Sequence, residues 1–218
     1  MGSEGPPEVT VHFTGFKKFH GVLENPTETI VNNLIGYMQK QGFPRGLVIG
    51  SCNVLETAGE GALDQLYKVF ELATNVQDNK LSSGRTILLH FGVNSGAMGF
   101  AVESQAVNEA TFLCPDELGW KPNKIPIIPS DGGIMQTRET SLPVVKIVKS
   151  LSEMGYDVVR SYDAGRFVCN YVYYHSLRFA EQHGISSLFV HFPLFITTDE
   201  ETQMRFAASL LDVLSCLN

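Results

Sequence analysis

Apolar residues along this 218-residue chain occur in two alternating patterns. Short continuous apolar runs are typical of strands that are buried on both faces of a parallel sheet. Longer segments with an apolar residue every three or four positions are typical of helices that bury one face. The short runs cover residues 9–13, 46–55, 85–94, 156–161 and 186–192, and the helical spacing covers residues 25–42, 60–75, 141–155, 168–184 and 199–217.

This alternation predicts an α/β fold with a single domain over residues 9–218. The expected architecture is a three-layer α/β/α sandwich around a mostly parallel, doubly wound sheet, which is phosphorylase/hydrolase-like. Residues 1–8 are expected to form a flexible N-terminal tail. Ligands of such sheets bind at the carboxyl edge, where strands end and helices begin.

Residue types with strong positional preferences mark the predicted helix boundaries. Pro26 is expected in the first turn of one helix and Gly42 at its end. Ser141 is expected to cap a later helix, with Pro143 in its first turn and Gly155 at its end.

Two segments lie outside this alternation. Residues 99–113 are predicted to be extended. Residues 114–133 are rich in proline and glycine and predict a long loop, which in a compact domain is usually functional. Its apolar residues suit either a lid or a contact between subunits.

Charge and composition narrow the classes of partner. The net charge is −7, and the basic residues are scattered, which argues against nucleic acid or an anionic membrane as a partner. No apolar run is long enough to span a bilayer, and the N-terminus does not read as a secretion signal. The four cysteines are far apart and form neither a C-x-x-C pair nor a zinc pattern, so we expect free thiols, a cytoplasmic location and no metal.

Cys169 lies in the segment SYDAGRFVCN, just after an Ala-Gly pair and at the start of a helical pattern. The positive end of a helix dipole favours a thiolate, which is the nucleophilic form of a cysteine. A cysteine on an aromatic helix is, on its own, more often a small buried core residue. A nucleophilic role therefore requires a base and a pocket elsewhere in the chain.

Among the six histidines, His191 stands at the predicted carboxyl end of a buried strand. That strand directly follows the Cys169 helix, so the two side chains are placed as a Cys–His nucleophile pair requires. His90 lies within an apolar strand and is expected to be a core histidine with satisfied hydrogen bonds. His175 and His183 fall in the exposed or middle parts of a helix and carry no special signal.

Glu103 is a carboxylate within an otherwise apolar extended segment. Because buried carboxylates are rare unless they are paired, Glu103 is a candidate for the group that orients an imidazole. The competing interpretation is an edge-strand residue that faces water, and the pattern alone does not decide between the two.

Taken together, these segments resemble pyroglutamyl peptidase I, also called pyrrolidone-carboxylate peptidase. SYDAGRFVCN is similar to the cysteine signature S-x-x-A-G-x-[YF]-V-C-N of that family, and FTGFKKFHGVLENPT is similar to its T-G-F-x-x-F-G-G…N-P opening. ESQAVN resembles its E-R-x-A-x-N segment, CPDE resembles part of its R-I-P-D-N, and LFVHFP resembles its strand with the catalytic histidine. The resemblance runs from about Val9 to the C-terminus.

The resemblance implies a cysteine-type omega-peptidase that removes N-terminal pyroglutamate (5-oxoproline) from peptides. It implies Cys169 as the nucleophile that forms a thioester, His191 as general base and acid, and Glu103 as the group that orients His191. No metal or organic cofactor is implied. The family often assembles into dimers or tetramers, so a homodimer or homotetramer is expected here.

The resemblance also implies that Phe16 and Phe19 hold the lactam ring of the substrate, with Asn25 close by. A flat, uncharged, amide-bearing ring suits aromatic faces and a few hydrogen-bonding groups. The competing interpretation of Phe16 and Phe19 is ordinary core packing.

The sequence departs from the family pattern around this ring site. Val93 stands where members have a glutamine that touches the lactam, and Ala97 stands where they have an arginine. Lys18 and Arg166 also differ from the residues that are common at these positions in the family. These changes concern recognition of the ring and leave the three catalytic positions intact.

Two other classes of function stay open at this point. One is another α/β hydrolase or transferase, such as a nucleoside phosphorylase, although no P-loop or G-x-G-x-x-G after a strand is present. The other is a pyroglutamyl-peptide binding protein that has lost turnover.

Overall fold

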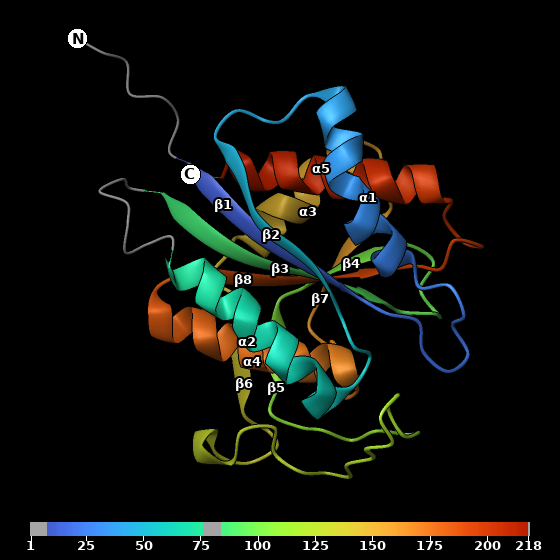
Figure 1. Cartoon of the computed structure of the whole chain (residues 1–218), viewed down its shortest axis with the longest axis vertical. Helices are drawn as coiled ribbons and strands as arrows, with labels where there is room; N and C mark the ends of the chain where they lie inside the picture. The colour runs from blue at the N-terminus through green and yellow to red at the C-terminus, as the bar shows by residue number, and fades with distance from the viewer. Residues whose placement is uncertain (1–7, 76–83, 218) are drawn as a thin grey trace.

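The computed structural model describes residues 8–75 and 84–217, and within these ranges it contains a central six-stranded sheet with the strand order β2-β1-β3-β8-β4-β7 (Figure 1). The strands of this sheet are β1 (Val9–Phe16), β2 (Leu47–Leu55), β3 (Arg85–Val93), β4 (Phe100–Glu103), β7 (Val158–Ser161) and β8 (Ser186–Phe192). A small second sheet pairs β5 (Gln105–Val107) with β6 (Thr137–Glu139) in antiparallel fashion. Residues 1–7 of the predicted tail, residues 1–8, lie outside the described part of the chain.

Helices cover both faces of the central sheet and form two outer layers (Figure 1). The helices are α1 (Pro26–Gln41), α2 (Gly59–Asn75), α3 (Val144–Glu153), α4 (Val168–His183) and α5 (Glu200–Ser215). One apolar cluster lies between the sheet and α1, α3 and α5, and a second lies between the sheet and α2 and α4. Neighbouring strands run parallel except β4 and β8. The predicted three-layer, mostly parallel α/β architecture is confirmed.

Side chains at the helix starts explain where α1 and α5 begin. Asn25 precedes α1 and accepts a hydrogen bond from the Thr27 N–H at 3.0 Å, and Pro26 opens the helix as predicted. Asp199 accepts in the same way from the Thr202 N–H before α5. The N-terminus of α4 has no such side-chain cap. The first N–H groups of α4 therefore remain available to another partner.

The first strand is longer than predicted, because β1 continues to Phe16 instead of ending at Phe13. Gly15 lies within the strand. A Cβ atom at this position would stand 2.4 Å from the carbonyl oxygen of Thr27. The glycine thus permits the close approach of α1 to the sheet rather than a change of chain direction.

The predicted cap of α3 is wrong. The helix begins at Val144 with Pro143 at the capping position, and the Ser141 hydroxyl lies 2.9 Å from the Ser186 hydroxyl. Met154 closes the helix and Gly155 follows it with a φ of 92°. Ser141 lies two residues before the capping position, too early to reach the first N–H groups of the helix, and it hydrogen-bonds to Ser186 of β8 instead.

The two segments outside the alternation fold around short pieces of regular structure. Residues 99–113 include β4 and β5, which are separated at Ser104. Residues 114–133 form the predicted long loop, with a single 3-10 turn at Pro129–Asp131. The Asp116 carboxylate accepts hydrogen bonds from the N–H groups of Trp120 and Gly59, and so ties this loop to the start of α2.

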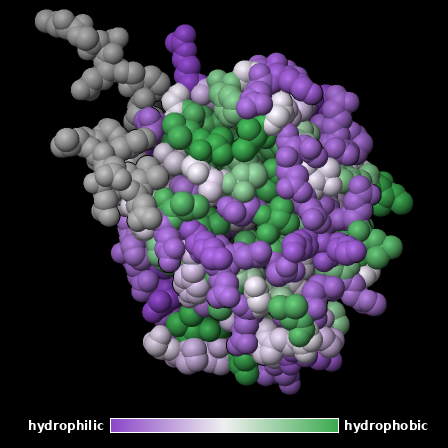
Figure 2. Space-filling view, in the orientation of Figure 1, coloured by the Kyte–Doolittle hydropathy of each residue, from purple (hydrophilic) through white to green (hydrophobic). Residues whose placement is uncertain are grey.

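Polar residues cover most of the face seen in Figure 2, with apolar residues in scattered groups between them. Across the described ranges, no helix combines the length and the apolar character that a bilayer crossing requires.

His90 is a buried core histidine, as predicted. Its Nδ1 lies 2.8 Å from the Thr14 hydroxyl and its Nε2 lies 2.7 Å from the Ser176 hydroxyl. Burial lowers the pKa of His90 to about 3. Because the unfolded chain takes up a proton near pH 6.5 and the folded chain does not, stability due to this group is present above pH 6.5 and is lost as the pH falls below it.

We therefore expect His90→Asn to lose less stability than the wild type when the pH falls from 7 to 5. The expected difference in the change of unfolding free energy is about 2 kcal/mol. Urea unfolding of both proteins at the two pH values measures it. Equal losses in both proteins would show that His90 titrates alike in the folded and unfolded states.

Candidate active site

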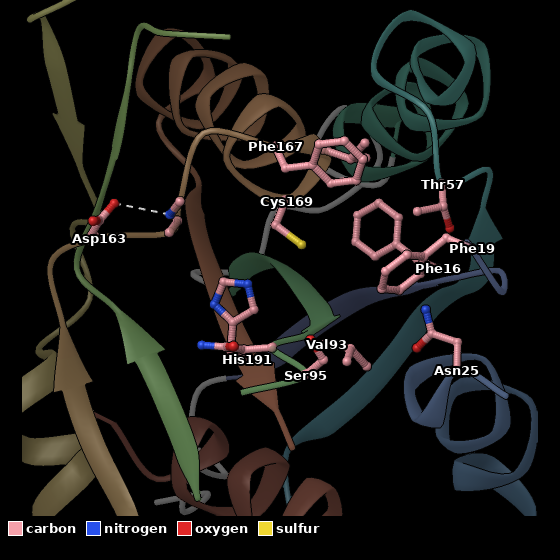
Figure 3. A pocket seen from close by; sticks show the side chains of 14 residues that line it. Phe16, Phe19, Asn25, Thr57, Val93, Ser95, Asp163, Phe167, Cys169 and His191 are labelled. Atoms are coloured by element: carbon pink, nitrogen blue, oxygen red, sulfur yellow. Dashed lines mark hydrogen bonds between the residues drawn. The ribbon is translucent and has the colours of Figure 1, made fainter. Parts of the chain in front are cut away.

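A pocket of about 280 Å³ opens at the carboxyl edge of the central sheet (Figure 3). Strands β1, β2, β3 and β8 are parallel, so their ends meet at this edge. Six of the residues predicted for the site line the pocket: Phe16, Phe19, Asn25, Val93, Cys169 and His191. The seventh, Glu103, lies behind His191. The structure thus brings together side chains that are up to 175 residues apart in the chain, from Phe16 to His191.

Cys169 is the second residue of α4. The turn that precedes it is closed by Gly165, which has a φ of 79° and donates its N–H to the Asp163 carboxylate at 3.1 Å. Cys169 is half-buried, and its sulfur points into the pocket (Figure 3). Cys169 thus lines the pocket while it also packs against the apolar cluster beneath α4.

His191 lies near the end of β8 and its imidazole faces the sulfur of Cys169 (Figure 3). Its Nδ1 is 2.8 Å from Oε1 of Glu103. Both residues are buried, with exposed fractions of 6% for His191 and 1% for Glu103. Glu103 therefore does not face water, because β4 lies between β8 and β7 instead of at the edge of the sheet.

The charges around His191 favour its protonated form. Burial acts most strongly and lowers the pKa of His191, but hydrogen bonding and charge interactions with Cys169 and Glu103 outweigh it and raise the pKa to about 10. The imidazolium is thus favoured throughout the neutral range, beside a sulfur on one side and a carboxylate on the other. Such a site can hold a thiolate–imidazolium pair, the arrangement of a cysteine nucleophile with its acid and base.

The predicted ring-binding residues form the opposite wall of the pocket (Figure 3). Phe16 is almost fully buried and packs in the core against Phe189, and it also lines the pocket. Phe19 is less buried and belongs to the loop after β1. The Asn25 amide donates to the Lys17 carbonyl at 2.9 Å, and Asn25 thereby fixes the loop that carries Phe19.

The residues that depart from the family pattern lie in different places. Val93 lines the pocket, whereas Ala97 stands outside it in the turn that follows β3. Lys18 is exposed and does not line the pocket. Arg166 points away and pairs with Glu109 at 3.1 Å.

Sequence reasoning missed several lining residues, including Thr57, Asn94, Ser95 and Phe167. The Thr57 hydroxyl donates to the Lys17 carbonyl at 2.6 Å, the same oxygen that Asn25 binds. A signal was available, because Thr57 follows the end of β2 at the edge where ligands of such sheets bind.

Gly92 has a positional role that follows from its missing side chain. It lies beside His191 in the pairing of β3 with β8. A Cβ at Gly92 would stand 2.5 Å from the Phe189 ring and 2.9 Å from the sulfur of Cys169. A glycine here is what allows the sulfur to approach the sheet.

We expect Gly92→Ala to lower kcat about 10- to 100-fold, because the added methyl displaces the sulfur from its position beside His191. Gly96→Ala is the matched control, since its nearest neighbour would be the Asn94 side-chain oxygen at 3.7 Å. Steady-state kinetics with a pyroglutamyl amide measure both variants. Equal kcat in Gly92→Ala and Gly96→Ala would mean that the missing side chain at Gly92 does not set the position of the sulfur.

The remaining histidines contribute nothing to the pocket. His175 is buried beside Tyr67 and Tyr171, and burial lowers its pKa to about 4. His183 packs against Phe179 on the same helix. Within residues 8–75 and 84–217, no group of three or more His, Cys, Asp or Glu side chains could hold a metal ion.

Comparison with known proteins places this site in a family. A sequence model described as pyroglutamyl peptidase matches residues 9–204 of the chain. The pyrrolidone-carboxylate peptidase of Pyrococcus furiosus is 32% identical over 183 residues, which are 83% of this chain and 78% of the relative. That of Klebsiella pneumoniae is 32% identical over 184 residues, or 84% and 77% of the two chains.

Solved structures agree in fold. A mutant pyrrolidone carboxyl peptidase from Pyrococcus furiosus matches with a TM-score of 0.76 and 26% identity, over 94% of this chain and 97% of the other. The pyrrolidone carboxyl peptidase of Fervidobacterium islandicum AW-1 matches in fold with a TM-score of 0.78, over 95% and 98% of the chains. With the sequence matches, these findings confirm the resemblance: the chain belongs to the pyroglutamyl peptidase family and is a cysteine peptidase.

Proposed function

We propose that this protein removes pyroglutamate from the N-terminus of peptides through a thioester on Cys169. The observation that carries the proposal is the position of the Cys169 sulfur at the start of α4, facing an imidazole that is itself held by the buried Glu103 carboxylate at 2.8 Å. Phe16, Phe19, Asn25 and Val93 are proposed to hold the substrate, and no cofactor takes part.

The first step forms the thioester. The Cys169 thiolate attacks the carbonyl carbon that links pyroglutamate to the next residue, and the carbonyl oxygen takes up the negative charge. The uncapped N–H groups at the start of α4 are placed to stabilise this oxyanion, an effect worth about 10²–10³ in rate per donor. The C–N bond then breaks as the His191 imidazolium gives its proton to the leaving amine.

The second step releases pyroglutamate. With its proton gone, the neutral imidazole of His191 takes a proton from a water molecule, which attacks the thioester. The C–S bond breaks, free pyroglutamate leaves, and the thiolate–imidazolium pair is restored. Through its hydrogen bond to Nδ1, Glu103 keeps the ring in the orientation that both steps require.

The lining of the pocket suits a small uncharged ring. Besides Cys169 and His191, Asp163 is the ionisable residue among the lining residues, and its carboxylate is already paired with Arg166 at 2.7 Å. A protonated N-terminal amine would therefore find no unpaired carboxylate there. A lactam carries no charge, so it loses less hydration free energy than an ammonium group when it enters between the rings of Phe16 and Phe19.

The test is turnover of pyroglutamyl-alanine amide, with prolyl-alanine amide and glutaminyl-alanine amide as matched controls. We expect release of free pyroglutamate and no measurable cleavage of the two controls, because both carry a charged amine. Binding of the pyroglutamyl dipeptide without product would support the alternative, a catalytically impaired binding protein, which the apolar Val93 in the pocket wall favours. Absence of both binding and turnover would contradict the proposal.

A cytoplasmic location and assembly into a homodimer or homotetramer are also proposed. Support for the location comes from the cysteines, which are all free, with Cys114 and Cys216 exposed. Light scattering of the purified protein tests the assembly.

A further inference from the structure

A second cavity of about 480 Å³ lies next to the pocket that holds Cys169, and we call it the flanking cavity. Phe19 and Phe167 line both spaces. Phe167 is two residues before Cys169 and immediately precedes α4. The flanking cavity therefore lies directly beside the proposed catalytic site, and these two phenylalanines form part of the wall of both.

The walls of the flanking cavity are mainly apolar. Leu113, Cys114 and Pro115 come from the start of the long loop and complete the wall formed by the two shared phenylalanine rings. The side chain of Leu113 is 91% exposed. A large apolar side chain left open to water at the rim of a cavity is typical of a surface that another molecule covers.

The charged groups around the flanking cavity are already engaged. Glu117 accepts a hydrogen bond from the His20 N–H at 2.7 Å. Arg166 pairs with Glu109 at 3.1 Å and with Asp163 at 2.7 Å. Glu117 is acidic and Arg166 is basic, and each already has a partner. The cavity therefore selects against a charged occupant of either sign.

We infer that the flanking cavity binds a large apolar side chain on the first residue of the leaving peptide, so that the protein prefers pyroglutamyl peptides with leucine or a similar residue after pyroglutamate. This inference rests on the proposed function. The peptide that leaves as an amine must extend away from the sulfur of Cys169, and the flanking cavity begins within two residues of it.

Steady-state kinetics test this preference. The ratio of kcat/KM for pyroglutamyl-leucine amide to that for pyroglutamyl-serine amide is expected to be about tenfold or more in the wild type, since the leucine side chain is removed from water in the cavity and the serine side chain gains little there. Leu113→Ser is expected to lower this ratio at least about threefold. Leu118→Ser is the matched control, because Leu118 is 66% exposed on the same loop but lies outside both cavities. The ratio of kcat/KM for the Leu118→Ser variant should equal that of the wild type.

A ratio near one in the wild type, or a ratio that Leu113→Ser leaves unchanged, would overturn the inference. If the wild type cleaves no pyroglutamyl substrate at all, the proposed function fails, and the cavity is then tested without turnover. The probe for this purpose is pyroglutamyl-cysteine amide, whose thiol is activated as a mixed disulfide with thionitrobenzoate. It is applied to the Cys169→Ala protein.

In this reaction the Cys114 thiol loses its proton to solvent and attacks the sulfur of the probe, and thionitrobenzoate leaves as a thiolate. Cys216 is an equally free, exposed cysteine remote from the cavity and serves as the internal control. Mass spectrometry is expected to find Cys114 labelled at least about tenfold faster than Cys216, and excess pyroglutamyl-leucine amide is expected to slow only the reaction at Cys114. Equal rates, or no effect of the competitor, would contradict a leaving-residue site in the flanking cavity.

Discussion

Cys169→Ala is expected to lower kcat for a pyroglutamyl amide at least about 10⁴-fold, the largest effect of any single substitution in this protein. The reason is that the thioester cannot form without the sulfur, and the N–H groups and the pocket alone give only a small residual acceleration. A fluorogenic pyroglutamyl amide measures the loss. Alkylation of the wild type with iodoacetamide is expected to abolish activity in the same way.

The matched control for this variant is Cys216→Ala, which removes an exposed thiol far from the pocket. It should keep the activity of the wild type. The binding of a pyroglutamyl dipeptide to Cys169→Ala, measured by calorimetry, should persist, because the sulfur contributes little to the ring pocket. A Cys169→Ala protein that turns over at the wild-type rate would assign the nucleophile elsewhere.

Glu103→Gln is expected to have the second largest effect, a loss in kcat of about 10²–10⁴-fold with little change in KM. Glutamine keeps the size of the side chain but removes its charge. Since the Glu103 carboxylate helps to raise the pKa of His191 to about 10 against the effect of burial, its loss lowers that pKa. The imidazolium that must protonate the leaving amine is then less favoured at neutral pH.

The pH dependence of alkylation separates this role from a merely structural one. In the wild type, iodoacetamide should react quickly with Cys169 even at pH 6, because the raised pKa of His191 keeps an imidazolium beside the sulfur at that pH. In Glu103→Gln the rate at pH 6 should fall, because the lower pKa of His191 leaves less imidazolium beside the sulfur. Unchanged alkylation at pH 6 together with full activity would mean that Glu103 does not act through His191.

Periodicity predicted the layers of this fold well, because buried parallel strands and amphipathic helices have distinct patterns. It could not predict that β4 runs antiparallel to β8. With four residues, β4 has no pattern that carries direction. This direction matters for the site, because it places Glu103 within reach of His191 from an interior strand.

The predicted site was incomplete where a role depends on backbone approach. Cys169 and His191 could be paired from their positions at a helix start and a strand end. The contribution of Gly92 could not be predicted, because a glycine in a strand does not indicate which neighbouring side chain occupies the space above it. Phe167 was missed because its position in the pocket depends on how the turn before α4 folds over the edge of the sheet.

The end of β1 and the start of α3 show the same limit. Gly15 and Ser141 are typical of a turn and a helix cap, and both are used otherwise: one for the approach of α1 and the other for a hydrogen bond to Ser186. Tertiary contacts decided these positions, and local preference did not.

The central claim is that the sulfur of Cys169 attacks the acyl carbon of pyroglutamate, and trapping the intermediate tests it most directly. The wild type is mixed with a pyroglutamyl ester, quenched in acid within milliseconds to seconds and digested. We predict that mass spectrometry finds one pyroglutamyl group, labile to hydroxylamine, on the peptide that contains Cys169. Rapid turnover with no acyl group on that peptide, or with the group on another residue, would contradict the account.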